Sequence, residues 1–551
     1  MIYLKTFIWL ILFRVISING QQVTTLNGVI QGRIEYSRRG ISFNAFLQIP
    51  YGKAGRFESP QPADPWEGVL NATSNNLVCI SQVPAQAPFI ESEQCLVLNV
   101  YTPKLPSEKN VSLPVLYFMH GGGFILGTGA FDFLGPHYFM EYEVIMVTIN
   151  YRLGLFGFLS TEDKIISGNF GFKDQQLGLK WVQDNIKYFG GDPTKVTIFG
   201  ESAGAASVSY QYLNKNSEGL FRAGIALSGS ALSPWGYQRN ARKYAYQMAS
   251  YLNSSFNENS TTTQIRELFL SVTPQKLRDA SWRIPTPVDQ LMEGFLFSAV
   301  IEMDHDEAFL SKSMYHAIEQ GHALRYPLMI GIASEEYILN VYDLDIFKKQ
   351  LAGYDDNVTM FVNDNMHLTD QATREAAGNA IRAVYTDGLL QDNLGRGVKY
   401  FSDNSFGRGI LQHAKLQSNY SDVYFYQFSY YGTKPGVRPD IPGADRVGHV
   451  DDAAYMWVTK NDSNLNDFPE SDIVTSERFL TLIVNFATSL NPTSCNTELL
   501  GIKKWPTVKP DNFLYLNIND TLEVLKDLKK DIHPELVAIY EKYAIKPYET
   551  F

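Results

Sequence analysis

Alternating apolar and polar positions follow residue 20 and predict strands with one buried face. The alternation runs through residues 23–32 and 34–49, and two turn pairs interrupt it, Asn27-Gly28 and Arg39-Gly40. Strands that are joined by such short turns pair antiparallel. We therefore expect the described pattern to produce an antiparallel portion of sheet near the N-terminus.

Farther along, apolar runs without alternation predict strands that are buried on both faces, separated by amphipathic helices. The predicted strands cover residues 96–101, 114–119, 144–149, 196–199, 223–227, 327–332, 423–430 and, as a final edge strand, 514–518. Helices are predicted over residues 174–188 and 475–490, and residues 235–320 are mostly helical in pattern. This βαβ rhythm predicts an α/β fold with a large, mostly parallel central sheet and helices on both faces.

The sharpest change of pattern lies at residues 195–212, KVTIFGESAGAASVSYQY. A β-branched and aromatic run ends at Gly200, small residues then favour a helix, and Ser202 occupies the reversal between them. Strand, turn and helix around Gly-Glu-Ser-Ala-Gly are typical of a nucleophile elbow, in which the serine takes a strained backbone conformation. G-x-S-x-G alone arises by chance about 0.2 times in a chain of this composition, so the interpretation of Ser202 as a nucleophile depends on that context.

A run of glycines follows the predicted strand at residues 114–119, in the sequence His120-Gly121-Gly122-Gly123-Phe124. Consecutive glycines expose backbone N–H groups at close range, which is what stabilisation of an oxyanion requires. A flexible turn is the alternative interpretation. Ligands of a parallel sheet bind at the carboxyl ends of its strands, where both this run and the elbow are expected.

A serine nucleophile needs a histidine base, which a carboxylate in turn orients. In elbow enzymes the chain order is serine, acid, histidine. His449 lies beside a glycine in a long polar loop after a predicted strand, and we take it as the candidate base. The alternative is a surface histidine that pairs with Asp451 or Asp452. Glu335 and Glu336 both follow a predicted strand, and the residues alone do not separate them as candidate acids.

Charge and cysteine content narrow the function classes. The 551 residues carry a net charge of -11 and no long basic run, so neither nucleic acid nor an anionic membrane is an expected partner. The three cysteines are scattered without metal-site spacing. A serine with its histidine base and carboxylate needs neither a metal nor an organic cofactor, so we expect none.

Residues 1–20 are typical of a secretory signal peptide, with Lys5 followed by an apolar run from Phe7 to Phe13. Arg14 makes that run too short to span a bilayer, so a stable membrane anchor is not expected. Residues 21–551 are then expected to form one domain of a secreted glycoprotein, and the oligomeric state stays open. Eight N-x-S/T sequons begin at Asn71, Asn110, Asn253, Asn259, Asn357, Asn419, Asn461 and Asn519.

Several blocks together resemble the type-B carboxylesterase family of the α/β-hydrolase fold, which is cholinesterase-like, and most of all its insect carboxylesterases. The blocks are SEQCLVLNVY at 92–101, HGGGF at 120–124, NYRLG at 150–154, FGGDPTKVTIFGESAG at 189–204, Gly448-His449, and Trp505-Pro506. They cover nearly the whole chain after residue 20. The resemblance implies a single α/β-hydrolase domain that hydrolyses small to medium apolar carboxylic esters through an acyl-enzyme.

The resemblance also implies a role for each matching residue of the site. Ser202, Glu336 and His449 would form the catalytic triad, the acid being the second of the two acidic residues after the strand. Tyr337 stands where the family usually has glycine. The backbone N–H groups of Gly122, Gly123 and Ala203 would be the oxyanion donors.

Cross-links and ion pairs carry over from the family in the same way. A disulfide would join Cys79 and Cys95, and Cys495 would remain as a semi-buried thiol, with an intermolecular link as the alternative. Ion pairs would join Arg56 to Glu93 and Arg152 to Asp174.

Two sequence differences, one from cholinesterases and one from juvenile hormone esterases, narrow the expected substrate. The loop between the first two cysteines contains no tryptophan to face a choline cation, which argues against acetylcholine. Juvenile hormone esterases typically carry glutamine before the serine, where this chain has Glu201. A pocket that includes Phe124 and Trp235 would suit xenobiotic, dietary or signalling esters. The alternatives are a catalytically inactive adhesion or binding protein and a lipase.

Overall fold

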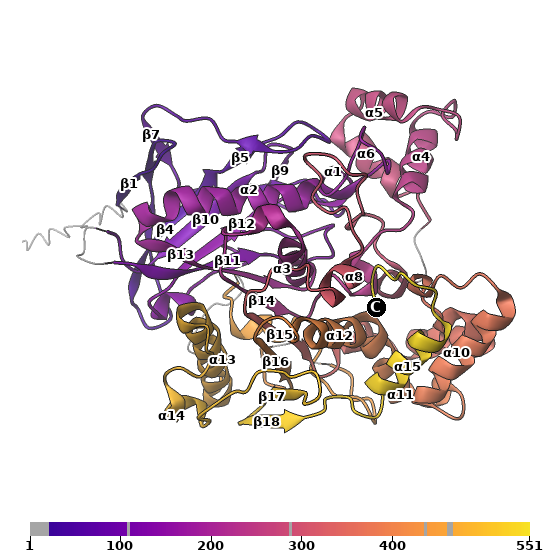
Figure 1. Cartoon of the computed structure of the whole chain (residues 1–551). Coiled ribbons are helices and arrows are strands. Elements are labelled where there is room, and N and C mark those ends of the chain that lie inside the picture. Colours follow the sequence, from indigo (N-terminus) through magenta and orange to yellow (C-terminus); the bar gives the residue numbers. More distant parts are fainter. Residues whose placement is uncertain (1–20, 107–110, 286–288, 435–437, 460–466) are drawn as a thin grey trace, which may run out of the picture.

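The computed structural model describes residues 21–106, 111–285, 289–434, 438–459 and 467–551 (Figure 1). The expected signal peptide at residues 1–20 and the sequons at Asn110 and Asn461 lie outside these ranges.

An 11-stranded sheet runs through the described part of the chain. From one edge to the other it contains β18 (Leu522–Lys526), β17 (Leu514–Ile518), β16 (Val423–Phe428), β15 (Leu328–Ala333), β14 (Ala223–Leu227), β13 (Gly191–Glu201), β11 (Leu113–Met119), β12 (Ile145–Ile149), β10 (Val97–Thr102), β4 (Ser42–Pro50) and β3 (Arg33–Tyr36). The strands from β17 to β12 pair parallel, whereas β10, β4 and β3 continue antiparallel. The predicted parallel sheet with an antiparallel N-terminal part is therefore present.

The prediction that residues 514–518 form an edge strand is wrong. Strand β18 pairs antiparallel with β17 and takes the edge position. Only Leu522 of β18 is buried, and the four residues after it are exposed. Its sequence therefore lacks the apolar run by which the neighbouring strands are recognised.

Small sheets accompany the N-terminal part of the chain. One contains β1 (Gln22–Thr24), β2 (Val29–Gln31) and β7 (Val69–Asn71); two others pair β5 (Gly52–Lys53) with β6 (Gln61–Pro62) and β8 (Leu77–Cys79) with β9 (Ile90–Ser92). The pairing of β1 with β2 closes the turn that Asn27-Gly28 predicts.

Helices connect the strands of the sheet. They are α1 (Gly154–Phe158), α2 (Phe170–Asn185), α3 (Ala203–Leu213), α4 (Ala241–Leu252), α5 (Thr262–Ser271), α6 (Pro274–Ser281), α7 (Gln290–Glu293), α8 (Met314–Glu319), α9 (Leu344–Asp356), α10 (Gln371–Tyr385), α11 (Leu394–Ser402), α12 (Arg408–Gln417), α13 (Glu470–Ser489), α14 (Thr497–Leu500) and α15 (His533–Tyr543). A π-helical turn, Asp403–Gly407, joins α11 to α12. In Figure 1, α4 to α6 and the group of α10, α11 and α15 lie on the right, opposite β1 and β7.

The two faces of the sheet carry separate hydrophobic cores. Tyr117 of β11 and Ile198 of β13 belong to the core that includes residues of α2 and α3. Phe118 and Phe199, the next residues along the same strands, belong to the core that includes residues of α13. Because successive side chains of a strand point to opposite faces, helices cover both faces of the sheet.

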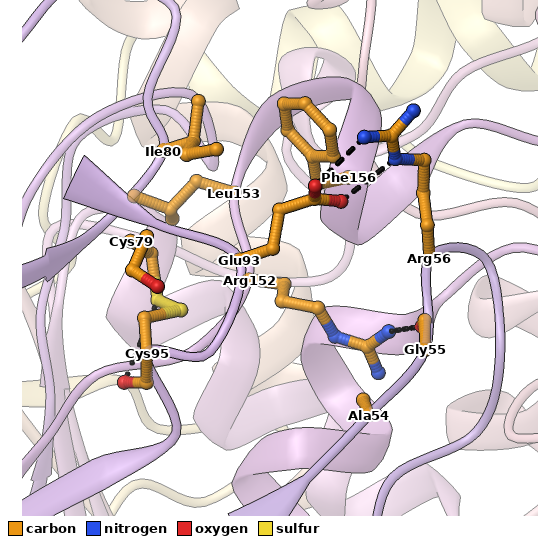
Figure 2. A pocket seen from close by; sticks show the side chains of 11 residues that line it. Ala54, Gly55, Arg56, Cys79, Ile80, Glu93, Cys95, Arg152, Leu153 and Phe156 are labelled. Atoms are coloured by element: carbon orange, nitrogen blue, oxygen red, sulfur yellow. Dashed lines mark hydrogen bonds and ion pairs between the residues drawn. A yellow bond between two sulfur atoms is a disulfide. The ribbon is translucent and has the colours of Figure 1, made fainter. Parts of the chain in front are cut away.

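The disulfide and the ion pairs implied by the resemblance are present, and Figure 2 shows the disulfide and the pair of Arg56 with Glu93. Cys79 and Cys95 are joined by an S–S bond of 2.01 Å. Arg56 makes two hydrogen bonds of 2.7 Å to Glu93, and Arg152 holds buried Asp174 at 2.7 and 2.8 Å. The cavity between these groups has a volume of about 10 Å³, which admits a single water molecule and no ester.

Cys495 is an exposed free cysteine, so the expectation of a semi-buried thiol is wrong. It lies between α13 and α14, and its thiol donates to Asn485 Oδ1 at 2.7 Å.

The first turn of α3 packs directly on the end of β11. A Cβ atom added at Gly204 would lie 1.9 Å from the carbonyl oxygen of Met119. The backbone of Gly204, which would carry the Cβ atom, and the Met119 carbonyl group are both closely packed. Neither can move without shifting the helix or the sheet. Gly204 therefore sets the distance between the helix and the sheet.

Gly204→Ala is expected to lower the free energy of unfolding by about 3 kcal/mol, because the added methyl group forces α3 away from β11. Urea denaturation of the purified protein measures this. Gly353→Ala is the matched control, since Gly353 lies inside α9 with no atom within 4 Å of its added Cβ. The control variant is expected to gain up to about 1 kcal/mol from helix propensity. Equal losses in the two variants would contradict this account.

Candidate active site

Ser202 lies at the reversal between β13, which ends at Glu201, and α3, which begins at Ala203. Its φ of 57° and ψ of -121° place it in a backbone region that residues with a side chain rarely adopt. Its N–H donates to the carbonyl of Leu227 at the end of the neighbouring strand β14, at 2.8 Å. The residue is buried, with 9 % of its surface exposed.

The two glycines of the elbow leave room for this reversal. A Cβ atom at Gly200 would lie 2.2 Å from the carbonyl oxygen of Gly204, and Gly204 itself lies against Met119. The strand and the helix can therefore approach this closely only because both positions lack a side chain.

Ser202, His449 and Glu336 form a continuous line of hydrogen bonds. The Nε2 atom of His449 lies 2.8 Å from Ser202 Oγ, and its Nδ1 atom lies 2.7 Å from Glu336 Oε2. Because a carboxylate only accepts, Nδ1 carries the proton and Nε2 is left to accept from the serine hydroxyl. The three residues that lie 113 to 247 positions apart in the chain thus meet at one point.

Glu336, rather than Glu335, is the acidic residue that contacts the imidazole. It is 1 % exposed, and its second oxygen accepts from the N–H of Ala333 at 2.8 Å. Its carbonyl oxygen also accepts from the N–H of His449 at 3.0 Å. Backbone and side chain therefore both fix the carboxylate relative to the histidine.

Glu335 points to a separate buried cluster with Asp403 and Lys529. Lys529 forms an ion pair of 2.5 Å with Asp403, and Glu335 accepts from the N–H of Asp445 at 3.3 Å. Burial raises the pKa of Glu335 to about 7, and the charge of Lys529 opposes that rise. This cluster was not predictable from the two adjacent acidic residues alone, because Lys529 comes from beyond β18.

The alternative partners of His449 are engaged elsewhere, and so is His413, a second histidine that follows the proposed acid in the chain. Asp451 accepts from the Gly448 N–H and from Arg438, each at 2.6 Å, and Asp452 accepts from the Tyr426 hydroxyl at 2.9 Å. His413 lies 2.8 Å from Ser230 Oγ. His449 is therefore neither a surface histidine nor a partner of Asp451.

Buried carboxylates surround the imidazole and set its charge. Burial lowers the pKa of His449, but the hydrogen bond and charge of Glu336, together with Glu201 and Asp452, outweigh it and raise the pKa above its ordinary value. Burial raises the pKa of Glu201 to about 8 and that of Asp452 to about 7. Glu201 Oε1 lies 3.5 Å from His449 Nε2, the same imidazole nitrogen that faces the Ser202 hydroxyl.

The glycine run lies against the elbow. A Cβ atom at Gly121 would lie 3.0 Å from Ser202 Cβ and 2.8 Å from the carbonyl oxygen of Glu201. Gly122 and Gly123 follow this contact, and Ala203 is the first residue of α3, whose N–H has no partner within the helix. The N–H groups that the resemblance implies as oxyanion donors thus come from two segments, the glycine run and the first turn of α3, and both adjoin Ser202.

Aromatic side chains border the site. Phe406, in the π-helical turn, has its ring centre 4.4 Å from that of His449 and 5.6 Å from that of Trp235. The ring of Phe295 lies 6.0 Å from Trp235 and covers Gly123, where an added Cβ atom would lie 3.0 Å from Cζ. Phe124 is buried behind Trp235, with ring centres 6.4 Å apart. Phe295 and Phe406 are site residues that the sequence analysis missed, because they come from segments whose positions the pattern does not fix.

The described residues contain neither a metal-binding cluster nor a helix that could span a membrane. Within those ranges, no group of three histidine, cysteine, aspartate or glutamate side chains is arranged to hold a metal ion. In the same part of the chain, none of the helices combines the length and the apolar character that crossing a bilayer demands.

Comparison with known proteins identifies the family. The model of the carboxylesterase family matches residues 19–534. A juvenile hormone esterase of Tribolium castaneum is 31% identical over an alignment of length 563. The alignment covers 95% of this chain and 94% of that protein. Esterase E4 of Myzus persicae is 33% identical, over 80% of this chain and 81% of that protein.

Similarity in three dimensions agrees with this result. The crystal structure of juvenile hormone esterase from Manduca sexta, with OTFP covalently attached, superposes with a TM-score of 0.81 at 26% identity. The match covers 94% of this chain and 99% of that one. The predicted fold class and family are thereby confirmed: the chain has the α/β-hydrolase fold and belongs to the carboxylesterase family.

Proposed function

We propose that this carboxylesterase hydrolyses its substrates through a catalytic triad of Ser202, His449 and Glu336. The observation that carries the proposal is the unbroken line of contacts from the serine hydroxyl to the imidazole, at 2.8 Å, and from the imidazole to the carboxylate, at 2.7 Å. A hydroxyl is a weak nucleophile, and this arrangement supplies the base and the group that orients it.

In the first half of the reaction, Ser202 Oγ attacks the ester carbonyl carbon as its proton passes to His449 Nε2. The imidazolium that forms is stabilised by the Glu336 carboxylate, which accepts from Nδ1–H. The tetrahedral intermediate then collapses as the bond to the alcohol oxygen breaks. His449 returns its proton to that oxygen, and the acyl group remains on Ser202.

In the second half, water takes the place of the alcohol. His449 accepts a proton from the water while its oxygen attacks the acyl carbon. The second tetrahedral intermediate releases the carboxylic acid, and Ser202 recovers its proton from the imidazolium. Each residue thereby returns to its starting state, and no oxidant, metal or cofactor takes part in the balance of atoms and electrons.

The oxyanion of both intermediates would accept from the backbone N–H groups of Gly122, Gly123 and Ala203. The contact of the glycine run with Ser202 supports this assignment. Donors that are held in place by packed backbone stabilise the developing charge without reorganising, and each is typically worth about 10² to 10³ in turnover.

Small to medium apolar esters fit the borders of the site best. Trp235, Phe295 and Phe406 place aromatic surface beside the glycine run and the imidazole, where an acyl group would lie. Such a wall favours apolar acyl groups and limits their length. Relatives named juvenile hormone esterase and esterase E4 are consistent with xenobiotic, dietary or signalling esters of this kind.

We also propose that the protein is secreted as one glycosylated domain, residues 21–551, after removal of a signal peptide at residues 1–20. The disulfide supports this, because such bonds persist in oxidising compartments. Among the sequon asparagines in the described ranges, those that are exposed are Asn71, Asn253, Asn259, Asn357 and Asn419.

An inactive adhesion or binding protein is not favoured, because the nucleophile, base and acid are all present and in contact. Lipid esters also belong among the substrates to assay. Bile salt-activated lipase of Rattus norvegicus is a relative, 29% identical over 87% of this chain.

Ser202→Ala is expected to lower the rate of p-nitrophenyl butyrate hydrolysis by at least about 10⁴-fold, because the attacking oxygen is lost. Steady-state kinetics of the purified protein measure this. Ser209→Ala, on the same helix and outside the hydrogen-bond line, is the matched control and should keep its rate within about threefold. Equal rates in wild type and Ser202→Ala would overturn the proposed mechanism.

Glu336→Gln is expected to lower kcat by about 10³ to 10⁴ and to move the acid limb of kcat/KM to lower pH. The base must be neutral, and Glu336 raises the pKa of His449, so removing its charge lets the imidazole lose its proton at lower pH. A pH series with p-nitrophenyl acetate measures both effects. Glu335→Gln is the neighbouring control and should leave the acid limb in place. If Glu335→Gln moved the limb and Glu336→Gln did not, the assignment of the acid would be wrong.

A further inference from the structure

Tyr337 directly follows the proposed acid in the chain. Its side chain is buried, and its ring stacks on that of Phe401 with centres 4.5 Å apart and planes at 20°. Its backbone N–H donates to Ser402 Oγ at 3.0 Å. The side chain is therefore held by α11 on one side, and its hydroxyl points to a different element.

The Tyr337 hydroxyl donates to Asp289 Oδ2 at 3.2 Å. Gln350, from α9, donates its Nε2–H to that hydroxyl at 3.2 Å and to the same carboxylate oxygen at 3.4 Å. Asp289 is 6 % exposed, and burial raises its pKa, which the hydrogen bond from Tyr337 opposes. The buried carboxylate thus depends on this hydroxyl for one of its few side-chain donors.

Asp289 fixes the start of α7. Its Oδ1 accepts from the N–H of Leu291 at 3.0 Å, and its carbonyl oxygen accepts from Met292 and Glu293. The helix is a single turn that ends at Glu293, Gly294 caps it, and Phe295 follows. A displacement of Asp289 is therefore transmitted through one helical turn to Phe295.

Phe295 is the side chain that covers the glycine run. Its ring lies 3.0 to 3.3 Å from the point where a Cβ atom of Gly123 would be, and 6.0 Å from Trp235. Its carbonyl oxygen accepts from Gln238 Nε2 at 2.6 Å, which holds the segment from the downstream side. Upstream, α7 is supported by Asp289 and, through it, by Tyr337, and also by Asn363, whose Nδ2–H donates to the Met292 carbonyl oxygen at 3.1 Å.

From this chain of contacts we infer that Tyr337 is a positioning residue that sets acyl-length specificity, through Asp289 and the Phe295 ring. The inference rests on the proposed function, since it assigns the wall that the acyl group would meet. The Tyr337 hydroxyl touches neither the serine, the imidazole nor the glycine run. Its effect is therefore on which ester is accepted rather than on the bond-breaking steps.

Tyr337→Phe tests this, because it removes the hydroxyl and keeps the ring that stacks on Phe401. The measurement is the ratio of kcat/KM for p-nitrophenyl hexanoate to that for p-nitrophenyl acetate. We expect this ratio to rise about fivefold, as loss of one buried hydrogen bond loosens the Phe295 wall. The ratio does not depend on the concentration of active enzyme, so partial unfolding alone would leave it unchanged.

Tyr342→Phe is the matched control, because Tyr342 belongs to the same segment and is 83% exposed. It should leave the ratio at the wild-type value. Phe295→Leu shortens the wall directly and should raise the ratio further. Adding Tyr337→Phe to Phe295→Leu should then change the ratio by less than about twofold, because the two residues act in series.

The inference is overturned if Tyr337→Phe keeps the wild-type ratio, or if its effect persists undiminished in the Phe295→Leu background. These outcomes differ from failure of the proposed function. If wild type and Ser202→Ala cleaved both esters at equal rates, the triad itself would be wrong, and the inference would fall with it. If Ser202→Ala alone lost activity, an unchanged ratio would count against Tyr337 only.

Discussion

The reversal of the chain at Ser202 is the constraint on which the site depends. The backbone there has a left-handed φ, which costs about 1 to 3 kcal/mol and persists only where surrounding structure enforces it. Enforcement comes from three sides: Gly200 and Gly204 in contact, Met119 beneath α3, and the hydrogen bond from the serine N–H to Leu227. Packing of the sheet against one helix thus determines where the hydroxyl points.

A second constraint is the number of acidic side chains beside this reversal. Glu201, Glu335, Glu336 and Asp452 are all buried, and they cannot all carry charge at neutral pH without strong repulsion. The pKa values of three of them rise to about 7 or 8. The remaining one, Glu336, accepts from the N–H of Ala333 and faces the imidazole.

The sequence was sufficient for the parts of the molecule that local pattern controls. Buried parallel strands are recognised as apolar runs, and the elbow is recognised as a run that ends in glycine and small residues, so the region around Ser202 was predictable. Strand β18 was missed because a solvent-exposed edge strand has almost no apolar signal. The exposure of Cys495 was also missed, since burial of a single thiol depends on tertiary packing.

The choice between Glu335 and Glu336 shows a different limit. Two neighbouring residues at the end of a strand point in different directions, and only the positions of His449 and Lys529 decide which direction leads to the site. Those partners lie more than a hundred residues away in the chain. The residues themselves left both possibilities open, and the family resemblance was needed to choose between them.

The origin of each side chain explains why the site was more predictable than its specificity. Ser202, the glycine run, Glu336 and His449 follow β13, β11, β15 and β16, which are strands of one parallel sheet, so their carboxyl ends meet at one edge. The aromatic wall comes instead from the long connections after β14 and β15, where helices pack on one another and no strand order fixes their place. Tyr337 bridges the two systems, because it follows the acid directly and bonds to the segment that carries Phe295. A single side chain can therefore alter the wall while the sheet keeps the reacting groups in register.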